Sequence, residues 1–469
     1  MTDMTAAEKR ALKAEKKAAK AALKAEKKAA KEAAKAALPK PPRLVSLDAL
    51  RGFDIFLLVF FDQVIHVWHS GPGKRFTDET GIWEKLWNCC PWIDDVGAVA
   101  EKTRAICSAL YQQCHHTGWN AGFSMLDELM PLFVFMAGAA IPFAFARYLT
   151  GERRRNCALW LRILRRVLVL WIFGMISQGN LLTLDPSTFK LFSNTLQSIA
   201  VGYFFSAIAY LYLPRKAWYA LFPLLLAAFW AGNQFLTFHG CGAGSYEPHT
   251  NIAYEIDKVL LGRFRDGAKL LEDGTVEFYD WYNYTWLYSS ITFFATALSG
   301  MLGGDLLYRV RDRLAAIPEE DKPARRRVEL KAFATILAAG VLFIVAAKLW
   351  NKVPEGSLFY CPIIKYIWTP SMVLYSSGIA YVLLALFYLV FDVCKSKFCR
   401  TFLVVWGTNA IAAYMITHVI RYGEVAGWFC YGLGRFVGDW MATVNAFVGA
   451  MLIWWFLYDN WKRGRFLRV

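Results

Sequence analysis

The sequence lacks the short signatures of nucleotide-dependent and metal-dependent enzymes. It contains no Gly-rich phosphate loop opening a helix, and no spacing of Cys and His that is typical of a zinc site. Nucleotide hydrolysis and a bound metal are therefore not expected. It also lacks a short basic region followed by an apolar stretch and a small-residue cleavage site, so no secretory signal is expected.

Charged residues are scarce and apolar residues are abundant. Asp, Glu, Lys and Arg make up 19% of the 469 residues, whereas hydrophobic residues make up 57%. The mean hydropathy of +0.31 is too high for an ordinary soluble protein. Apolar stretches of about 20 residues, the length that crosses a bilayer, lie at 47–67, 128–149, 158–178, 195–213, 217–238, 286–308, 332–350, 370–392, 402–420 and 439–459.

These apolar stretches predict the fold class. Only α-helices and closed β-barrels span lipid, because backbone polar groups find no water there. The stretches are too long and too continuous for the alternating strands of a barrel. We therefore predict an all-α, polytopic membrane protein with about ten transmembrane helices, of which the first is the least hydrophobic.

The positive charge is distributed in a way that favours a membrane over a nucleic-acid partner. The net charge is +16, and 37 of the 53 Lys and Arg residues lie in six segments. All six segments share one side of the membrane if the ten stretches alternate. Basic loops are typical of the cytoplasmic side, so both termini are predicted to be cytoplasmic. We expect the lipid bilayer as a partner and no nucleic acid.

The chain is predicted to have a basic tail at 1–43, a transmembrane domain at 44–460 and a basic cytoplasmic C-terminus at 461–469. The tail repeats ALKAEKKAAKA as ALKAEKKAAKE, which favours either a helix near anionic headgroups or a disordered tail. Segments 68–126 and 239–285 are too long for simple turns, and we interpret them as a cap over the outer face. Seven of the ten cysteines fall on that side, where disulfides are permitted but their pairing stays open.

Ionisable residues in the first apolar stretch are candidates for a functional site. Asp48 and Arg51 are three residues apart and therefore share one face of the predicted helix. They form either a structural ion pair that fixes helix packing or a polar anchor near a cytoplasmic ligand entrance.

A second group of candidates stands where the stretch QQCHHTGWNAGFSMLDELMPLF enters the next apolar run. His115, His116 and Asp127 are costly residues at such a boundary, so a chemical role is favoured. Histidine is suited to general-base catalysis near neutral pH, and a carboxylate partner orients the imidazole.

Five motifs follow one another along the chain. They are SLDALRGFD at 46–54, the stretch 116–135, NTLQSIAVGY at 194–203, PIIKYIWTPSMVL at 362–374 and GTNAIAAY at 407–414. Together they resemble motifs of the heparan-alpha-glucosaminide N-acetyltransferase family and its bacterial relatives, within the wider class of transmembrane acyltransferases. The matching residues include His116, Trp119, Gly122, Asp127, Pro131, Leu196, Gln197, Tyr203, Pro362, Lys365, Trp368, Thr369, Ser371, Gly407, Asn409 and Tyr414.

The resemblance implies an enzyme that moves an acetyl group from cytoplasmic acetyl-CoA to the amine of an amino sugar or glycan. The acceptor would lie on the periplasmic side of a bacterial inner membrane, and the enzyme would be a homodimer. His116 would be the base and Asp127 its partner. The residues expected to bind the donor or the acceptor are Asp48, Arg51, Trp119, Asn120, Gln197, Lys365, Trp368, Ser371 and Asn409.

Several alternatives stay open at this point. One residue more than the resemblance predicts separates Trp119 from Gly122, so His115 is an alternative base, although counting from Trp119 favours His116. The histidine acts either as a base in direct transfer or as a nucleophile that carries the acetyl group. Two alternatives to an enzyme are a transporter of an amino sugar or sugar fragment and a non-catalytic assembly partner. No inverted repeat is evident, which disfavours transport.

Overall fold

The computed structural model describes residues 44–90, 93, 95–149, 157–179, 181–271 and 273–466. The chain divides into two units, Met1–Leu44 and Val45–Val469. The predicted tail at 1–43, with its 11-residue repeat, lies outside the described residues, as do the last three residues. The description below concerns the second unit alone.

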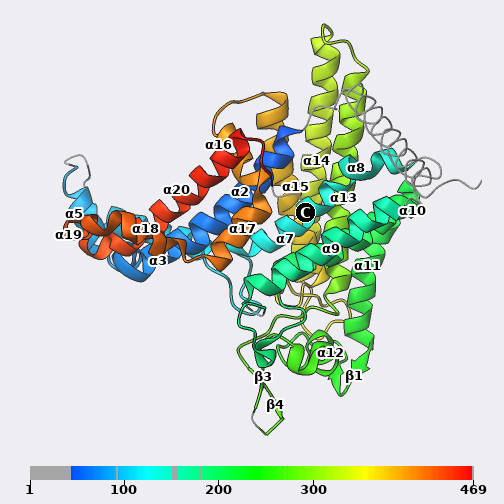
Figure 1. Cartoon of the computed structure of the whole chain (residues 1–469), viewed down its shortest axis with the longest axis horizontal. Helices are drawn as coiled ribbons and strands as arrows, with labels where there is room; N and C mark the ends of the chain where they lie inside the picture. The colour runs from blue at the N-terminus through cyan, green and yellow to red at the C-terminus, as the bar shows by residue number, and fades with distance from the viewer. Residues whose placement is uncertain are drawn as a thin grey trace, which may run out of the picture. The chain divides into compact units, whose positions relative to one another are not determined.

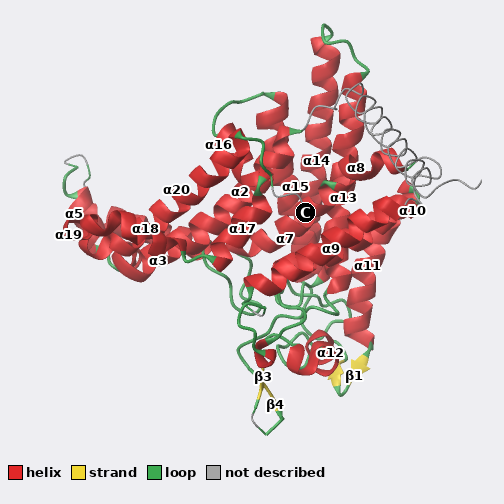
Figure 2. Ribbon diagram, viewed as in Figure 1, coloured by secondary structure: helices red, strands yellow, loops and turns green. Residues whose placement is uncertain are grey.

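The described chain is mostly helical, which confirms the predicted all-α class (Figures 1 and 2). Its α-helices are α2 (Val45–Val59), α3 (His66–Trp68), α4 (Lys74–Asp78), α5 (Gly81–Trp87), α6 (Val96–Gln113), α7 (Leu129–Ala139), α8 (Ile141–Phe145), α9 (Cys157–Ser177), α10 (Thr195–Tyr212), α11 (Arg215–Phe235), α12 (Ile252–Leu261), α13 (Ser290–Ala315), α14 (Lys322–Asn351), α15 (Pro370–Phe387), α16 (Arg400–Thr408), α17 (Ala410–Val419), α18 (Tyr422–Cys430), α19 (Gly434–Val437) and α20 (Met441–Lys462).

Short helical turns and two small hairpins complete the described elements. The turns are η1 (Phe60–Ile65), η2 (His69–Gly73), η3 (Leu126–Glu128), η4 (Ala146–Tyr148), η6 (Pro186–Thr188), η7 (Gly262–Phe264), η8 (Tyr388–Val393), η9 (Tyr431–Leu433) and η10 (Gly438–Trp440). The strands pair antiparallel, β1 (Thr237–Phe238) with β2 (Cys241–Gly242) and β3 (Ala268–Leu270) with β4 (Val276–Phe278). Both hairpins belong to the loops that follow α11 and α12 (Figure 2).

The apolar helices support a membrane protein but do not establish ten spans. Six described stretches are long and apolar enough to cross a bilayer, or seven if the bent pair α16 and α17 is one span. The six are Leu126–Phe145, Thr195–Tyr212, Ser290–Ala315, Lys322–Asn351, Pro370–Val393 and Tyr422–Lys462. The bent pair turns by 74° at its break.

Three predicted spans fall short for identifiable reasons. Helix α2 runs for only 15 residues before the π-helical turn η1, and it carries three charged residues. Helix α9 has a suitable length of 21 residues, but three arginines lie along it. Helix α11 is equally long and contains amide side chains and a proline. Each feature raises the cost of exposing the helix to lipid.

Glycines allow two helices that bear candidate residues to pack at very close range. A β-carbon at Gly52 of α2 would overlap the carbonyl oxygen of Leu403 in α16. A β-carbon at Gly407 of α16 would overlap the carbonyl oxygen of Asp48 in α2. Such pairs of small residues are typical of helix crossings in membranes, where close backbone packing replaces the hydrophobic effect. The motifs at 46–54 and 407–414 therefore meet at one helix crossing.

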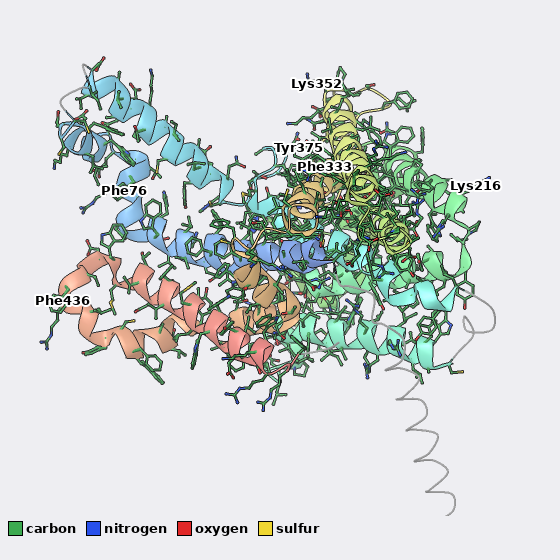
Figure 3. The ribbon with its side chains drawn as sticks, turned by 90° about the horizontal axis from the view of Figure 1, so that it is seen from above. Phe76, Lys216, Phe333, Lys352, Tyr375 and Phe436 are labelled. Carbon is green, nitrogen blue, oxygen red and sulfur yellow. The ribbon has the colours of Figure 1, made fainter. Side chains whose placement is uncertain are left out.

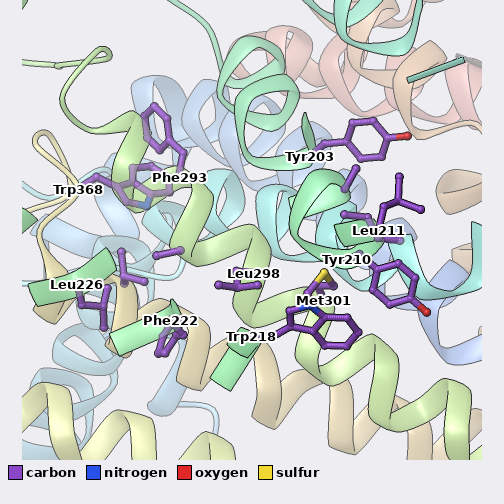
Figure 4. Packing of buried hydrophobic residues seen from close by; sticks show 14 of the residues in the cluster. Tyr203, Tyr210, Leu211, Trp218, Phe222, Leu226, Phe293, Leu298, Met301 and Trp368 are labelled. Carbon is purple, nitrogen blue, oxygen red and sulfur yellow. The ribbon is translucent and has the colours of Figure 1, made fainter. Parts of the chain in front are cut away.

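The largest hydrophobic core joins α10, α11 and α13 and reaches the site (Figure 4). The ring of Tyr210 stacks on that of Trp218 with centroids 5.0 Å apart. Phe293 meets the buried Trp368 edge to face at 4.8 Å. The Trp368 indole also donates a hydrogen bond of 3.0 Å to Thr296 Oγ1. Because Trp368 belongs to this core and also borders the cavity described below, core packing fixes one wall of the site.

The two long segments interpreted as a cap have different structures. Residues 68–126 include α4, α5 and α6, and Figure 3 shows Phe76 of α4 and Phe436 of α19 on the same side of the molecule. Phe76 contacts Trp440 at a ring distance of 6.4 Å. Only the end of this segment, after α6, reaches the candidate site. Residues 239–285 contain β2, α12 and the hairpin of β3 and β4, and Asp266, Trp281, Tyr282 and Tyr284 of this segment line the site. All ten cysteines are described, and none forms a disulfide.

Candidate functional site

Asp127 is the centre of the candidate site, and a local sequence pattern positions it. Ser124 and Asp127, three residues apart at the start of η3, exchange a reciprocal pair of hydrogen bonds. Ser124 N–H donates to Asp127 Oδ2 at 3.1 Å, and Asp127 N–H donates to Ser124 Oγ at 3.3 Å. The reciprocal bonds fix the carboxylate, and its side chain is fully buried.

His116 is held by this carboxylate. Its Nδ1 lies 2.9 Å from Asp127 Oδ1. Oδ2 of the same carboxylate accepts bonds from the N–H of Thr117 at 3.2 Å and from its hydroxyl at 2.7 Å. The His116 side chain is 54% exposed. Asp127 therefore orients the imidazole through Nδ1, and the rest of the ring is accessible to solvent. In a neutral imidazole with a proton on Nδ1, Nε2 is the remaining acceptor.

Lys365 reaches the same carboxylate from the loop that precedes α15. Its Nζ lies 2.5 Å from Asp127 Oδ1, and the lysine is only 7% exposed. Burial lowers the pKa of Lys365, and the negative charge of Asp127 opposes this shift. His116, Asp127 and Lys365 therefore form one contiguous ionisable group.

The loop that carries Lys365 is braced by its own hydroxyl groups. Thr369 Oγ1 and Ser371 Oγ both donate to the carbonyl of Pro362 at 2.7 Å. The N–H of Ile364 donates to Thr369 Oγ1 at 3.1 Å. Ser371 is fully buried and takes part in this bracing, so it supports the loop and does not face a cavity.

A tight turn in the same loop directs Lys365. The N–H of Trp368 donates to the carbonyl of Lys365 at 3.2 Å, which closes the turn. Trp368 has a φ of +53°, in the left-handed region. That conformation costs a large side chain on the order of 1–3 kcal/mol. The packing of Trp368 in the hydrophobic core offsets this cost, so the fold enforces the turn.

The three ionisable residues border a cavity of about 490 Å³. Its lining residues come from α2, η3, α7, α10, α15, α17 and the loops between helices, and they are Leu58, His116, Leu126, Asp127, Leu129, Met130, Phe133, Gln178, Ser193, Asn194, Thr195, Asp266, Trp281, Tyr282, Tyr284, Trp286, Lys365, Trp368, Met372, Tyr414 and His418. The helices supply mainly apolar side chains, whereas the loop between α12 and α13 supplies aromatic rings and a carboxyl group. The cavity therefore offers two chemically different surfaces around His116.

Loop residues 262–289 form the aromatic wall of this cavity. Tyr284 and Trp286 line it, and Trp281 is 74% exposed beside them. Asp266 adds a half-buried carboxyl group, whose pKa is raised by burial. Asp257 fixes this loop because its carboxylate accepts from the N–H of Trp286 at 2.6 Å. Aromatic faces beside a carboxyl group suit a ligand that bears hydroxyl groups and an ammonium.

The start of α10 and the helix α17 together form a second wall of the cavity. Asn194 Nδ2 donates to Tyr414 Oη at 3.2 Å. The ring of His418 stacks on that of Tyr414 with centroids 4.0 Å apart. Two of the family-like motifs, at 194–203 and 407–414, therefore contribute to the cavity through residues that the sequence analysis did not assign to the site.

Gln197 has a structural position. It is fully buried, and its Oε1 accepts from the N–H groups of Ser193 at 2.8 Å and of Asn194 at 3.1 Å. Its Nε2 donates to the carbonyl of Leu191 at 2.9 Å. Asn194 and Gln197 thus form the capping box of α10. Gln197 holds Asn194 at the cavity and does not line the cavity itself.

The remaining predicted residues lie away from this cavity. Trp119 and Asn120 line a second cavity, which is described below. Asn409 is buried at the break between α16 and α17. Asp48 and Arg51 form a half-buried ion pair at 3.5 Å. None of these five residues borders the 490 Å³ cavity.

The alternative base His115 points to different neighbours. Its Nε2 lies 3.0 Å from the hydroxyl of Tyr111, and its ring is 5.4 Å from that of His66. It does not line the cavity that contains His116. The two adjacent histidines therefore occupy different environments.

Most cavity residues were not placed in the site from the sequence, and Asn194, Asp266, Tyr284 and His418 are among them. For Asn194, the pattern Asn-Thr-Leu-Gln is a capping-box signal that indicates a helix start. For Asp266 and Tyr284, no local pattern indicates a role, because a long loop brings them to the site.

The chain matches no protein-family model, and no curated protein matches it at a significant level.

Proposed function

We propose that this protein is a transmembrane acetyltransferase that transfers an acetyl group from acetyl-CoA to the amine of an amino sugar or glycan. The observation that carries the proposal is the hydrogen bond from His116 Nδ1 to the buried Asp127, beside Lys365, at a cavity with one apolar and one aromatic wall. The five-motif resemblance supports the same activity.

The proposed base is His116 Nε2. An amino-sugar ammonium first loses one proton to the solvent, because only the neutral amine attacks a thioester. As the C–N bond forms, Nε2 accepts the second proton of the nitrogen, and Asp127 stabilises the resulting imidazolium. As the C–S bond breaks, the imidazolium returns this proton to the sulfur. The products are the acetamide, the thiol of CoA and one proton in solution.

Lys365 is the proposed donor to the oxyanion. The transition state places negative charge on the acetyl oxygen, and a fixed donor in a site with little water stabilises that charge. An ammonium has three N–H groups, of which one is directed to Asp127. Asn120 and Asn409, which the sequence analysis expected to bind the donor or the acceptor, do not line this cavity.

The two surfaces of the cavity suit two substrates. Leu58, Met130 and Phe133 offer an apolar surface for the uncharged arm that carries the thioester. Asp266 and Trp281 offer a carboxyl group and an exposed ring for the acceptor. In this arrangement the acetyl carbon and the acceptor nitrogen would meet at His116.

The test uses the full-length protein in liposomes, with labelled acetyl-CoA on one side and glucosamine on the other. We expect labelled N-acetylglucosamine from the wild type, and a loss of about a hundredfold to ten-thousandfold in His116→Ala. His115→Ala is the matched control, because it removes the adjacent histidine outside the cavity, and it should keep its activity. If only His115→Ala lost acetyl-transfer activity, the base would be His115 and not His116.

Two further outcomes would replace the proposal. Labelled sugar that crosses the membrane without any acetyl transfer would identify a transporter of amino sugars instead. Label that stays on the protein after acid quenching, without acceptor, would indicate an acetyl-histidine intermediate in place of direct transfer. Absence of both acetyl transfer and transport with glucosamine and its oligomers would contradict the enzyme assignment.

A further inference from the structure

A second cavity of about 380 Å³ lies on the other side of the segments that build the site. Trp119 and Asn120 line it, and they follow His116 in the same loop. Ile364 also lines it, and its neighbour in sequence, Lys365, lines the first cavity. The two cavities therefore flank one pair of loops.

The partition between the two cavities is rigid. Trp119 stacks on Tyr366 with ring centroids 5.4 Å apart, and its indole N–H donates to the carbonyl of Tyr246 at 3.2 Å. The Tyr366 hydroxyl donates to the carbonyl of Thr117 at 2.9 Å. Three extended residues span at most about 10 Å, so the Cα atoms of His116 and Trp119 lie within that distance.

The lining of the second cavity is polar and carries negative charge. Glu247 and Glu355 stand at its rim, and the Asn120 side chain hydrogen-bonds Tyr360. Both glutamates lie near enough to Tyr360 to raise the pKa of its hydroxyl, after burial as the main cause. Gln234 adds a buried Oε1 that has no hydrogen-bond partner among the described residues. No Lys or Arg lines the cavity.

We propose that this cavity is a subsite for a neighbouring unit of the acceptor, and that the acceptor is an oligosaccharide of amino sugars. The proposal rests on the proposed function and narrows its substrate class. The Trp119 ring and the Tyr360 ring provide apolar faces, Asn120 and Gln234 provide amide partners for hydroxyl groups, and the two glutamates attract ammonium groups. A unit bound here would hold the chain while the terminal amine reaches His116.

The test measures binding to the full-length protein in detergent by calorimetry. The probes are glucosamine, its β-linked tetramer and the fully N-acetylated tetramer, which lacks the ammonium groups. We expect the amine tetramer to bind more tightly than either of the others. In the double variant Glu247→Gln with Glu355→Gln, we expect the Kd of the amine tetramer to rise about tenfold, because two rim charge contacts are lost.

Glucosamine binding should stay within about twofold in that double variant, since a monomer is held at the first cavity. The matched control is Glu319→Gln with Glu320→Gln, which removes two exposed carboxylates between α13 and α14. It should change neither Kd. Equal affinity of the wild type for monomer and tetramer would overturn the subsite, as would an unchanged tetramer Kd in the double variant.

The binding measurement separates this proposal from the proposed function. If the amine tetramer binds as expected but no acetyl group moves, the subsite stands and the acetyltransferase assignment falls. If acetyl transfer to glucosamine occurs while the tetramer gains no affinity, the enzyme stands and the subsite falls.

Discussion

Lys365 Nζ lies 2.5 Å from Asp127 Oδ1, although 238 residues separate them in the sequence. Both side chains are almost inaccessible to solvent, with exposures of 7% and 0%. A buried ammonium is costly unless a partner compensates it, and burial does lower the pKa of Lys365. The pair therefore joins the loop of His116 to the loop of Lys365 and determines the charge at the site.

Asp127→Asn should reduce both stability and activity. The change leaves the Lys365 ammonium buried without its partner, which costs on the order of 3–5 kcal/mol. It also removes the acceptor that orients His116, so acetyl transfer should fall by about a hundredfold or more. The thermal midpoint in detergent and the rate of acetyl transfer in liposomes would measure the two effects.

The double variant Asp127→Asn with Lys365→Met provides the control for that prediction. It removes both charges, so most of the lost stability should return, because replacing a buried ion pair by apolar groups is often neutral. Activity should stay low, since His116 lacks its partner. A single variant as stable as the wild type would show that the pair does not contribute to the fold.

Gln197→Ala should destabilise the protein without a specific effect on substrate binding. The change leaves the N–H groups of Ser193 and Asn194 and the carbonyl of Leu191 without partners, at a cost of about 2 kcal/mol or more. We expect a lower thermal midpoint and an unchanged KM for both substrates per folded molecule. A raised KM at an unchanged midpoint would instead indicate that Gln197 contacts a ligand.

Asp257 gives the contact between α12 and the loop before α13 a defined pH dependence. Burial raises the pKa of its carboxyl to about 7, although the N–H groups of Leu287 and Trp286 favour the charged form. The folded state thus holds a proton that the unfolded chain, with its pKa of 3.8, has released. This contribution is fully present below the unfolded pKa and is lost as pH rises through about 7, and it amounts to at most about 4 kcal/mol.

The comparison with Asp257→Asn isolates that contribution. The asparagine does not titrate, so the thermal midpoint of the wild type minus that of the variant should decrease as pH rises from about 4 to about 7. Other titrating groups are common to both proteins and cancel in the difference. A difference that stays constant or increases over this range would contradict the raised pKa.

Gly52→Ala should disrupt the crossing of α2 and α16. The added methyl group would overlap the backbone of Leu403, and a backbone atom cannot move aside without separating the helices. We expect a loss of several kcal/mol of stability and little folded protein, as is typical of overpacking at a tight contact. Gly81→Ala is the control, because nothing lies within 4 Å of a β-carbon there. Equal yields of the two variants would show that the helices do not need this close approach.

The sequence by itself determined the helical class and the local framework of the site. Long apolar stretches require helices, since lipid offers no partner for backbone groups. Asn194 and Gln197 form a capping box, and Ser124 and Asp127 exchange two hydrogen bonds. Both sets of bonds lie within four residues and need no other part of the chain. The pairing of His116 with Asp127, eleven residues apart, was expected from the motif that contains both residues.

Only the tertiary structure decided which residues face the cavity. Trp119 and Asn120 share a loop with His116 but lie at a different cavity, and Asp266 reaches the site from the loop that follows α12. The contact between Asp127 and Lys365 depends on the turn at Trp368, which the core around Phe293 enforces. Local propensity extends over a few residues, whereas the direction of each of these side chains is set by packing between segments far apart in the chain.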